Sequence, residues 1–233
     1  DLDLRLARRE AITLDVSMAP VEWRLYEAAR RWTWRLMQLR HPDSDRFDWA
    51  LVIPERMASS SLPAFARHVQ TQLRDAARNA LDFGAEGGDE LDDVTMREAE
   101  HRLLNRFGDL DELIDAADDL GDVDSKYEAL RTWLLASLDD DQDGGVLLFS
   151  HFRGTLAHLK ARLTEDGVSC EVLSGSTKMV DRETLRHQFA NGEFDVLLSS
   201  EVGSEGLDQQ HCHRLVNYDL PWNPMRIEQR IGR

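Results

Sequence analysis

The fold is decided by the run from residue 146 to residue 200, which reads VLLFSHFRGTLAHLKARLTEDGVSCEVLSGSTKMVDRETLRHQFANGEFDVLLSS. Short apolar, β-rich stretches alternate in it with helical segments, and a further apolar stretch, HRLVNYD, follows at 213–219. The predicted strands lie at 146–150, 169–173, 195–200 and 213–219, and the predicted helices between them at 154–166 and 180–191. Continuous apolar strands that alternate with helices indicate βαβ units and a buried parallel sheet. This part is therefore predicted to be α/β, with any site along the edge where the strands end.

The residues before this run are predicted to be mostly helical. The expected helices cover 19–40, 61–81, 95–107, 109–120 and 123–138. In the first of them, Trp23, Tyr26, Trp34 and Met37 fall at helical spacing, and such a stripe ordinarily faces a core. We therefore expect these four side chains to be buried.

The first twenty residues contain EAITLDVSM, in which Ile12, Leu14 and Val16 alternate with polar or small neighbours. This alternation is typical of a half-buried strand. The chain is thus expected to divide into a linker or strand over 1–20, a helical insertion with an acidic loop over 21–122, and an α/β lobe over 123–233.

The formal net charge of −16 argues at first against a nucleic-acid binder. Its distribution removes that objection, because residues 81–143 hold 21 acidic and 5 basic residues and so carry the whole excess. This acidic segment has two interpretations. It is either a solvated insertion, or an electrostatic element that repels nucleic acid or docks on a basic partner surface.

Two cysteines, Cys170 and Cys212, give no disulfide framework and favour a reducing cytoplasm. The sequence has no signal-peptide core and no apolar run of membrane-spanning length. Because it opens on Asp1 rather than Met, we expect it to be part of a longer soluble protein. We predict no metal site, since the cluster HCHR (211–214) has no second ligand pair at zinc spacing.

The predicted strand ends carry groups that suit phosphates. The four strands lead in turn into SHF (150–152), LSGST (173–177), SSEVGSEGLD (199–208) and YDLPWNPMRIEQRIGR (218–233). Glycines at 203 and 206 let a backbone approach a ligand closely, and Asp208 offers an acceptor for a ribose hydroxyl. Arg230 and Arg233 lie three apart on a predicted helix and suit a charge clamp on a transferring phosphoryl group.

These stretches, in this order, resemble the motifs of a known family. VLLFSHF is similar to motif IV of superfamily-two helicases, LLSSEVGSEGLD to motif V, and YDLPWNP followed by QRIGR to the approach to motif VI. Residues 126–233 resemble the C-terminal RecA-like lobe of these proteins, most of all that of the Swi/Snf-type ATPases in the bacterial RapA-like, RNA-polymerase-associated branch. RREAITLDVSMAPVEWRLYE resembles the chain leaving the first lobe, and ERMASSSLPAFARHV a helical insertion of that branch.

The resemblance implies a RecA-like parallel sheet flanked by helices, preceded by a mostly helical segment, in a chain that stops within motif VI. It also implies residue roles. Arg233 matches the first arginine finger, which reaches ATP on the other lobe, and Gln229 and Arg230 match the residues before it that couple the lobes. Gly206 and Asp208 match the end of motif V that approaches the nucleotide. The expected nucleic-acid contacts are Ser150, His151, Gly175, Ser176, Thr177, Ser199, Ser200 and Glu201.

The implied function is that of the second motor lobe of an ATP-dependent nucleic-acid translocase. ATP and Mg²⁺ would be bound mainly by the first lobe of the same protein, with duplex DNA as the favoured track. The chain alone is expected to hold no cofactor and to hydrolyse negligible ATP, since an arginine finger acts on a nucleotide held elsewhere. Two alternatives stay open. One is a non-catalytic RecA-like module that docks a partner such as RNA polymerase, and the other is an unrelated small-molecule α/β enzyme.

Overall fold

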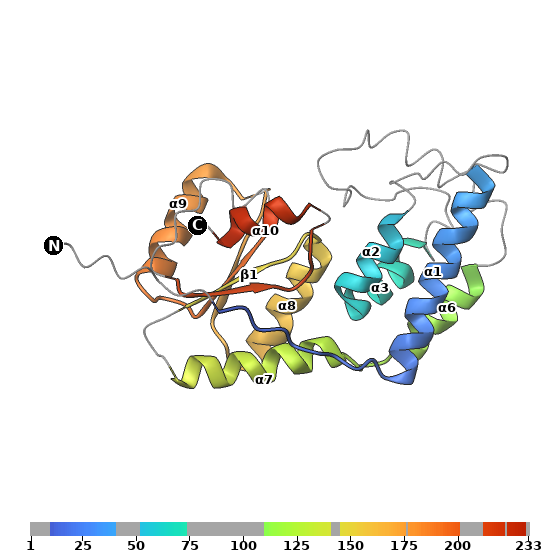
Figure 1. Cartoon of the computed structure of the whole chain (residues 1–233), viewed down its shortest axis with the longest axis horizontal. Helices are drawn as coiled ribbons and strands as arrows, with labels where there is room; N and C mark the ends of the chain where they lie inside the picture. Colours follow the sequence, from blue (N-terminus) through green and yellow to red (C-terminus); the bar gives the residue numbers. More distant parts are fainter. Residues whose placement is uncertain are drawn as a thin grey trace.

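A computed structural model describes residues 10–40, 52–73, 110–140, 145–175, 177–200, 212–221 and 223–231. The elements in chain order are α1 (Pro20–Arg40), α2 (Ile53–Ser60), α3 (Leu62–His68), η2 (Val69–Leu73), α6 (Leu110–Asp119), α7 (Ser125–Asp140), β1 (Val146–Phe149), α8 (Arg153–Glu165), β2 (Cys170–Leu173), α9 (Met179–Ala190), β3 (Val196–Ser199), β4 (Arg214–Asn217) and α10 (Pro224–Ile231). Figure 1 shows them in two parts, side by side. We call α1, α2, α3, η2 and α6 the helical unit, and the four strands with α7 to α10 the sheet lobe.

The sheet lobe is built on four parallel strands in the order β2-β3-β1-β4. The two central strands, β1 and β3, pair along their full length, with Val146 opposite Val196 and Phe149 opposite Ser199. Every residue of both is buried, which is why their sequences are continuous rather than alternating apolar runs. The predicted parallel α/β sheet and its four strands are confirmed.

Helices cover both faces of this sheet. Tyr127 of α7 and Leu159 of α8 pack with Leu148 and Leu198 on one face. Phe189 of α9 packs with Leu147 and Leu197 on the other. Figure 1 shows α7 beneath the sheet and α9 and α10 above it. The lobe is therefore a three-layer sandwich of the kind that parallel sheets require.

The helical unit has its own core. The buried residues of α1 and α6 include alanines at 28, 29, 116 and 117, and these small side chains let two helices lie close together. Larger side chains such as Leu25, Trp32, Phe65 and Leu113 pack around them. One member of this core comes from the sheet lobe: Phe152, from the loop after β1, is buried among the helices. The two parts are thus locked together by at least one side chain.

The strand expected in the first twenty residues is wrong for the described part of that segment. Residues 10–19 form no strand, and Ile12 is 64% exposed, with Leu14 and Val16 also at the surface. An alternating pattern becomes a strand only where a neighbour completes the hydrogen-bond ladder. Among the described residues no strand pairs with this segment.

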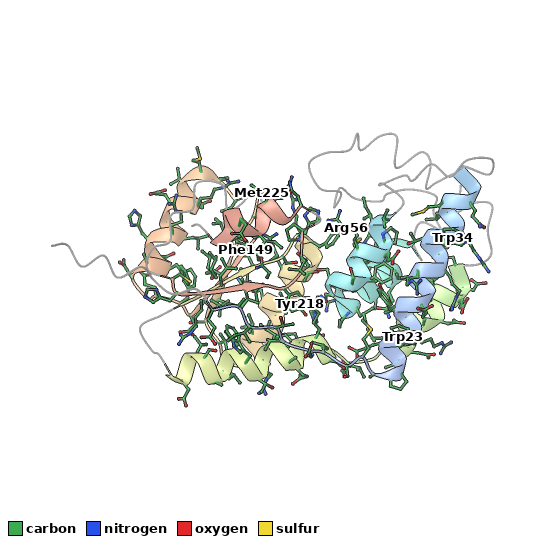
Figure 2. All side chains as sticks on the ribbon, in the orientation of Figure 1. Trp23, Trp34, Arg56, Phe149, Tyr218 and Met225 are labelled. Atoms are coloured by element: carbon green, nitrogen blue, oxygen red, sulfur yellow. The ribbon has the colours of Figure 1, made fainter. Side chains whose placement is uncertain are left out.

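The aromatic stripe of α1 also points differently from its prediction. Trp23 and Trp34 are 53% and 62% exposed, while Tyr26 and Met37 are only partly buried against the core. The buried face is formed by Leu25, Ala28, Ala29, Trp32 and Leu36. Figure 2 shows Trp23 and Trp34 on α1, on the side of the molecule away from the sheet. Because α1 carries apolar residues on more than one face, its periodicity alone does not select the stripe that packs.

The helix predicted from residue 61 to residue 81 begins as expected, at Leu62, and passes into a π-helical turn over Val69–Leu73. Residues 74–81 lie outside the described part, as does the predicted helix at 95–107. A further helix, α2, lies in the stretch whose resemblance implied a helical insertion, but it was not predicted as a separate helix. Ser61 separates α2 from α3, because its backbone is extended and its Oγ accepts the N–H of Ala64 at 3.3 Å. Ser60 therefore stands at the carboxyl end of α2.

Part of the acidic excess lies on α6, where two of its carboxylates pair with arginine side chains of α1. Arg31 of α1 pairs with Glu112 at 2.6 Å, and Arg24 pairs with Asp119. All four side chains are about half exposed, so each pair contributes at most about 1 kcal/mol. The hypotheses of an electrostatic gate or a docking surface stay predictions.

Candidate functional site

All four strands end at the same edge of the sheet, because they run parallel. The main-chain ladder continues one residue beyond them: Ser150 N–H donates to the carbonyl of Ser199 at 3.1 Å, and Tyr218 N–H to that of Phe149 at 2.9 Å. Ser200 N–H likewise donates to Leu173 at 3.0 Å. The residues predicted to follow β1 and β3 are therefore brought together here.

The serines of this edge have buried side chains. Ser150 and Ser199 are fully buried, and Ser200 is 7% exposed. Ser199 Oγ donates to the carbonyl of Ser200 at 3.1 Å. His151 is half-buried, with its ring edge-on to Phe152 at 4.9 Å between centroids. Their predicted contact with a nucleic-acid backbone stays a prediction, and in this arrangement the hydroxyl groups of Ser150 and Ser199 are engaged within the protein.

The carboxylate of Asp219, which follows β4, is the centre of the edge. Its Oδ2 accepts the hydroxyl protons of Ser150 and Ser60, each at 2.7 Å. The main-chain N–H of His151 donates to Oδ1 at 2.9 Å and to Oδ2 at 3.1 Å. A carboxylate that accepts several hydrogen bonds in a half-buried position is held firmly in one orientation.

A lysine on α7 contacts the same group of residues. Lys126, on α7, donates from Nζ to the carbonyls of Ser59 at 3.0 Å and Ser60 at 2.8 Å, the last carbonyls of α2. Its ammonium group lies 4.4 Å from the centre of the Tyr218 ring. Burial lowers the pKa of Lys126 to about 8, although the nearby carboxylates of Asp219 and Asp124 act in the opposite direction. Burial likewise raises the pKa of Tyr218 well above its usual value.

Helix α10 places Arg230 at this edge as well. The guanidinium is 4% exposed, and its Nη1 donates to Asn217 Oδ1 at 2.7 Å and to the main-chain carbonyl of Asp219 at 3.4 Å. It also stacks over the ring of Phe149, 5.0 Å from its centre. Figure 2 labels Phe149 in the sheet beside α10. The arginine predicted on the motif VI helix thus lies against the ends of β1 and β4.

The loop after β2 contains three of the predicted contact positions. Thr177 Oγ1 accepts the N–H of Ser174 at 3.1 Å, and Thr177 N–H donates to the carbonyl of Ser174 at 3.0 Å. Arg182 of α9 braces the loop by donating to the carbonyls of Gly175 and Thr177, both at 2.8 Å. Gly175 and Thr177 are half-buried, so the loop presents part of its surface to solvent.

Several predicted residues lie outside the described part of the chain. These are Ser176, Glu201, Gly206, Asp208, Trp222 and Arg233, together with the side chains of Pro224 and Gln229. Asn223 is described, and its Oδ1 accepts the N–H of Met225 at 3.0 Å at the start of α10. In the ranges that are described, no three His, Cys, Asp or Glu side chains gather as a metal site would require. No helix in those ranges is long and apolar enough to cross a membrane.

Sequence reasoning missed Asp219, Asn217, Ser60, Lys126 and Arg182. Asp219 carried one usable signal, since it is the last residue of a predicted strand, where parallel sheets present their polar groups. Ser60 and Lys126 carried none, because their partners are remote in the chain: Ser60 and Asp219 are 159 positions apart.

A family comparison agrees with the fold of the sheet lobe. Residues 125–233 match the model described as "Helicase conserved C-terminal domain". This part of the chain is a helicase C-terminal domain with the RecA-like fold of superfamily-two helicases, as the motifs implied.

Curated relatives place it beside the RapA-like proteins. The chain is 37% identical over 116 residues to "Uncharacterized ATP-dependent helicase YqhH" of Bacillus subtilis (strain 168), which covers 50% of this chain and 20% of the relative. It is 39% identical over 104 residues to "RNA polymerase-associated protein RapA" of Sodalis glossinidius, covering 43% and 11%. The chain therefore matches about a fifth or less of the length of these relatives.

Solved structures show the same fold beyond the sheet lobe. A helicase domain of Hef from Pyrococcus furiosus superposes with a TM-score of 0.62 at 16% identity, over 94% of this chain and 50% of the other. The C-terminal part of the Fun30 ATPase domain gives 0.53 at 16% identity, over 93% and 77%. Both likenesses cover more of the chain than the sheet lobe alone, and so extend to helical residues.

Proposed function

We propose that this chain is the second motor lobe of an ATP-dependent nucleic-acid translocase of the Swi/Snf type. The observation that carries the proposal is the position of α10. The helix predicted to be motif VI lies against the carboxyl edge of the sheet, with Arg230 bonded at 2.7 Å to Asn217. An arginine-bearing helix at such an edge is placed to meet a nucleotide presented by another domain.

In this proposal the lobe acts on ATP that is held mainly elsewhere. Arg233 would contact the γ-phosphate when the lobes close, and Gly206 and Asp208 would approach the nucleotide. Arg230, which is buried, would hold α10 in place so that Arg233 and Gln229 face the other lobe. Mg²⁺, bound with ATP on the first lobe, would neutralise charge on the transferring phosphoryl group.

The nucleic-acid track would run across the same edge. The half-buried His151, Gly175 and Thr177 would contribute contacts there, with Ser176 and Glu201 beside them in sequence. The buried Ser150, Ser199 and Ser200 would shape the edge. Contacts of this kind bind phosphates and do not distinguish one nucleic acid from another. Duplex DNA is therefore favoured as the track on the family resemblance alone.

The relatives named RNA polymerase-associated protein suggest a partner for the full-length protein. We propose that RNA polymerase is the load on which the motor acts, in the cytoplasm. The competing function is a RecA-like module that docks on such a partner without hydrolysing ATP.

The test is ATP hydrolysis by the full-length protein, with duplex DNA, single-stranded DNA or RNA added in turn and the 233-residue chain as the blank. Stimulation by one polymer, with negligible turnover by the chain alone, would support the motor and name its track. No turnover with any polymer, in the presence and absence of RNA polymerase, would leave the docking module as the better account.

A further inference from the structure

The helical unit and the sheet lobe meet at a cluster of polar groups that are buried or half-buried. Five residues form it, and we call them the joint: Ser60, Lys126, Ser150, Thr155 and Asp219. They come from α2, α7, the end of β1, α8 and the segment after β4, respectively. Figure 2 shows Arg56 of α2 on the side of the helical unit that faces the lobe, and its guanidinium lies 5.7 Å from the centre of the Phe152 ring.

Ser60 is the point where the helical unit enters the joint. It is fully buried, and its Oγ bonds with Asp219 Oδ2 at 2.7 Å and with Thr155 Oγ1 at 2.8 Å. Being the last residue of α2, it also has a carbonyl without a helical partner, and Lys126 donates to that carbonyl at 2.8 Å. Both the side chain and the main chain of Ser60 are therefore fixed by the sheet lobe.

Asp219 connects Ser60 to the edge of the sheet. Its carboxylate holds Ser60, Ser150 and the N–H of His151 at the same time. Its own main-chain carbonyl accepts a hydrogen bond from the guanidinium of Arg230 at 3.4 Å. The same guanidinium donates at 2.7 Å to Oδ1 of Asn217, the last residue of β4. A displacement of Asp219 would therefore displace Arg230 and with it α10.

A second contact attaches the helical unit to the same loop. Phe152, one residue after His151, is buried in the core of the helical unit. The loop that carries His151 is thus held at one end by Asp219 and at the other by the helices. The helical unit is therefore fixed to the two segments on which the proposed track and the proposed arginine helix depend, and also to the start of α7, where the Ser125 N–H donates to Glu22 Oε1 at 2.8 Å.

We propose that Asp219 is a positioning residue through which the helical unit sets the placement of α10 and of the loop at His151. This inference rests on the proposed motor function for its catalytic consequence. In this proposal Asp219 contacts no reacting group, and it acts by fixing the main-chain positions of its neighbours. A misplacement of about 1 Å at a site that must meet a substrate costs about 10²-fold in rate, so loosening the joint is expected to lower turnover without weakening ATP binding.

The experiment replaces Ser60 in the full-length protein, with its neighbour as the control. Ser60→Ala removes the hydroxyl that Asp219 and Thr155 bind, whereas Ser59→Ala removes an exposed hydroxyl that bonds only locally, to the carbonyl of Arg56 at 2.9 Å. We expect Ser60→Ala to lower the polymer-stimulated kcat by about 10-fold or more, to leave the KM for ATP within about twofold, and Ser59→Ala to change neither. Asp219→Asn should lower kcat at least as far, and adding Ser60→Ala to it should cause little further loss, because the two changes break one connection.

Hydrogen exchange on the same preparations separates this inference from the proposed function. Ser60→Ala should speed amide exchange in 224–231 and 151–156, relative to both wild type and Ser59→Ala, while the strands stay protected. If Ser60→Ala matches Ser59→Ala in exchange and in kcat, the inference is overturned. If wild type shows no stimulated turnover, the motor proposal fails, and the exchange result alone decides whether Asp219 positions α10.

Discussion

The sheet lobe and the helical unit are stabilised in different ways. The lobe buries large side chains on both faces of β1 and β3, so its two central strands have no exposed residue. The helical unit packs alanines where α1 meets α6, with larger anchors such as Trp32 around them. In the two central strands every residue is buried, whereas in α1 of the helical unit residues two positions apart differ in burial.

The largest effect is expected at one of those anchors. Trp32 is 6% exposed and Trp34, two residues away on the same helix, is 62% exposed. Trp32→Ala should lower the free energy of unfolding by about 3–5 kcal/mol, because it leaves a large cavity. Trp34→Ala should change it by no more than about 0.5 kcal/mol. Urea unfolding of the 233-residue chain, followed by far-UV circular dichroism, measures both.

Equal losses of unfolding free energy in the two variants would contradict this difference in burial, since they would mean that Trp34 also packs against a core. The pair further shows whether the two parts unfold together. A single transition in Trp32→Ala indicates that the joint couples them, and two transitions indicate that it does not.

The same contrast explains how much the sequence revealed. A central strand such as β1 is buried on both faces, so its apolar run has one interpretation, and all four strands were predicted. In α1 the apolar residues cover several faces, and only tertiary packing selects Trp32 over Trp34. The position of Arg230 near the strand ends followed from the motif order. Asp219 with Ser60 did not, because a contact between positions so far apart depends on how the two parts are docked.

The next effect lies where the two parts join. Asp124 Oδ2 contacts His158 Nε2 at 2.7 Å, and its Oδ1 accepts the N–H of Tyr127 at 3.0 Å at the start of α7. Both side chains of the pair are buried. Asp124→Ala should therefore cost about 2–4 kcal/mol, from the lost helix cap and from a buried His158 left without this partner. Differential scanning calorimetry against Asp122→Ala, an exposed neighbour, provides the matched control. Similar melting temperatures for the two variants would contradict the role given to the pair.

The smallest effect is a pH dependence. Burial lowers the pKa of Lys126 to about 8 in the folded protein, against 10.5 for an exposed lysine. Between these values the unfolded chain binds more protons than the folded one, so the contribution of Lys126 makes stability rise with pH from about 8 to about 10. Below pH 8 the lysine is charged in both states, and its contribution no longer changes.

Lys126→Met keeps most of the aliphatic stem and removes the titrating group. The difference in unfolding free energy between wild type and this variant should therefore grow in favour of wild type across pH 8–10. Taking the difference cancels other groups that titrate there, including Cys212, whose pKa burial raises above its usual value. Urea unfolding at half-unit pH steps is sufficient. A difference that stays constant with pH would show that Lys126 is not buried as described.

We have proposed that the sheet lobe supplies Arg233 to ATP bound on another lobe. The most direct test of this proposal is steady-state ATP turnover by the full-length protein with its best polymer, comparing wild type, Arg233→Ala and Arg30→Ala. Arg30 lies on α1 and is exposed, paired with Glu27 at 2.7 Å, so it controls for the loss of a positive charge. The account predicts that Arg233→Ala lowers kcat by about 10³-fold or more, with ATP binding nearly unchanged, while Arg30→Ala behaves as wild type. Turnover by Arg233→Ala within a few-fold of wild type would contradict it.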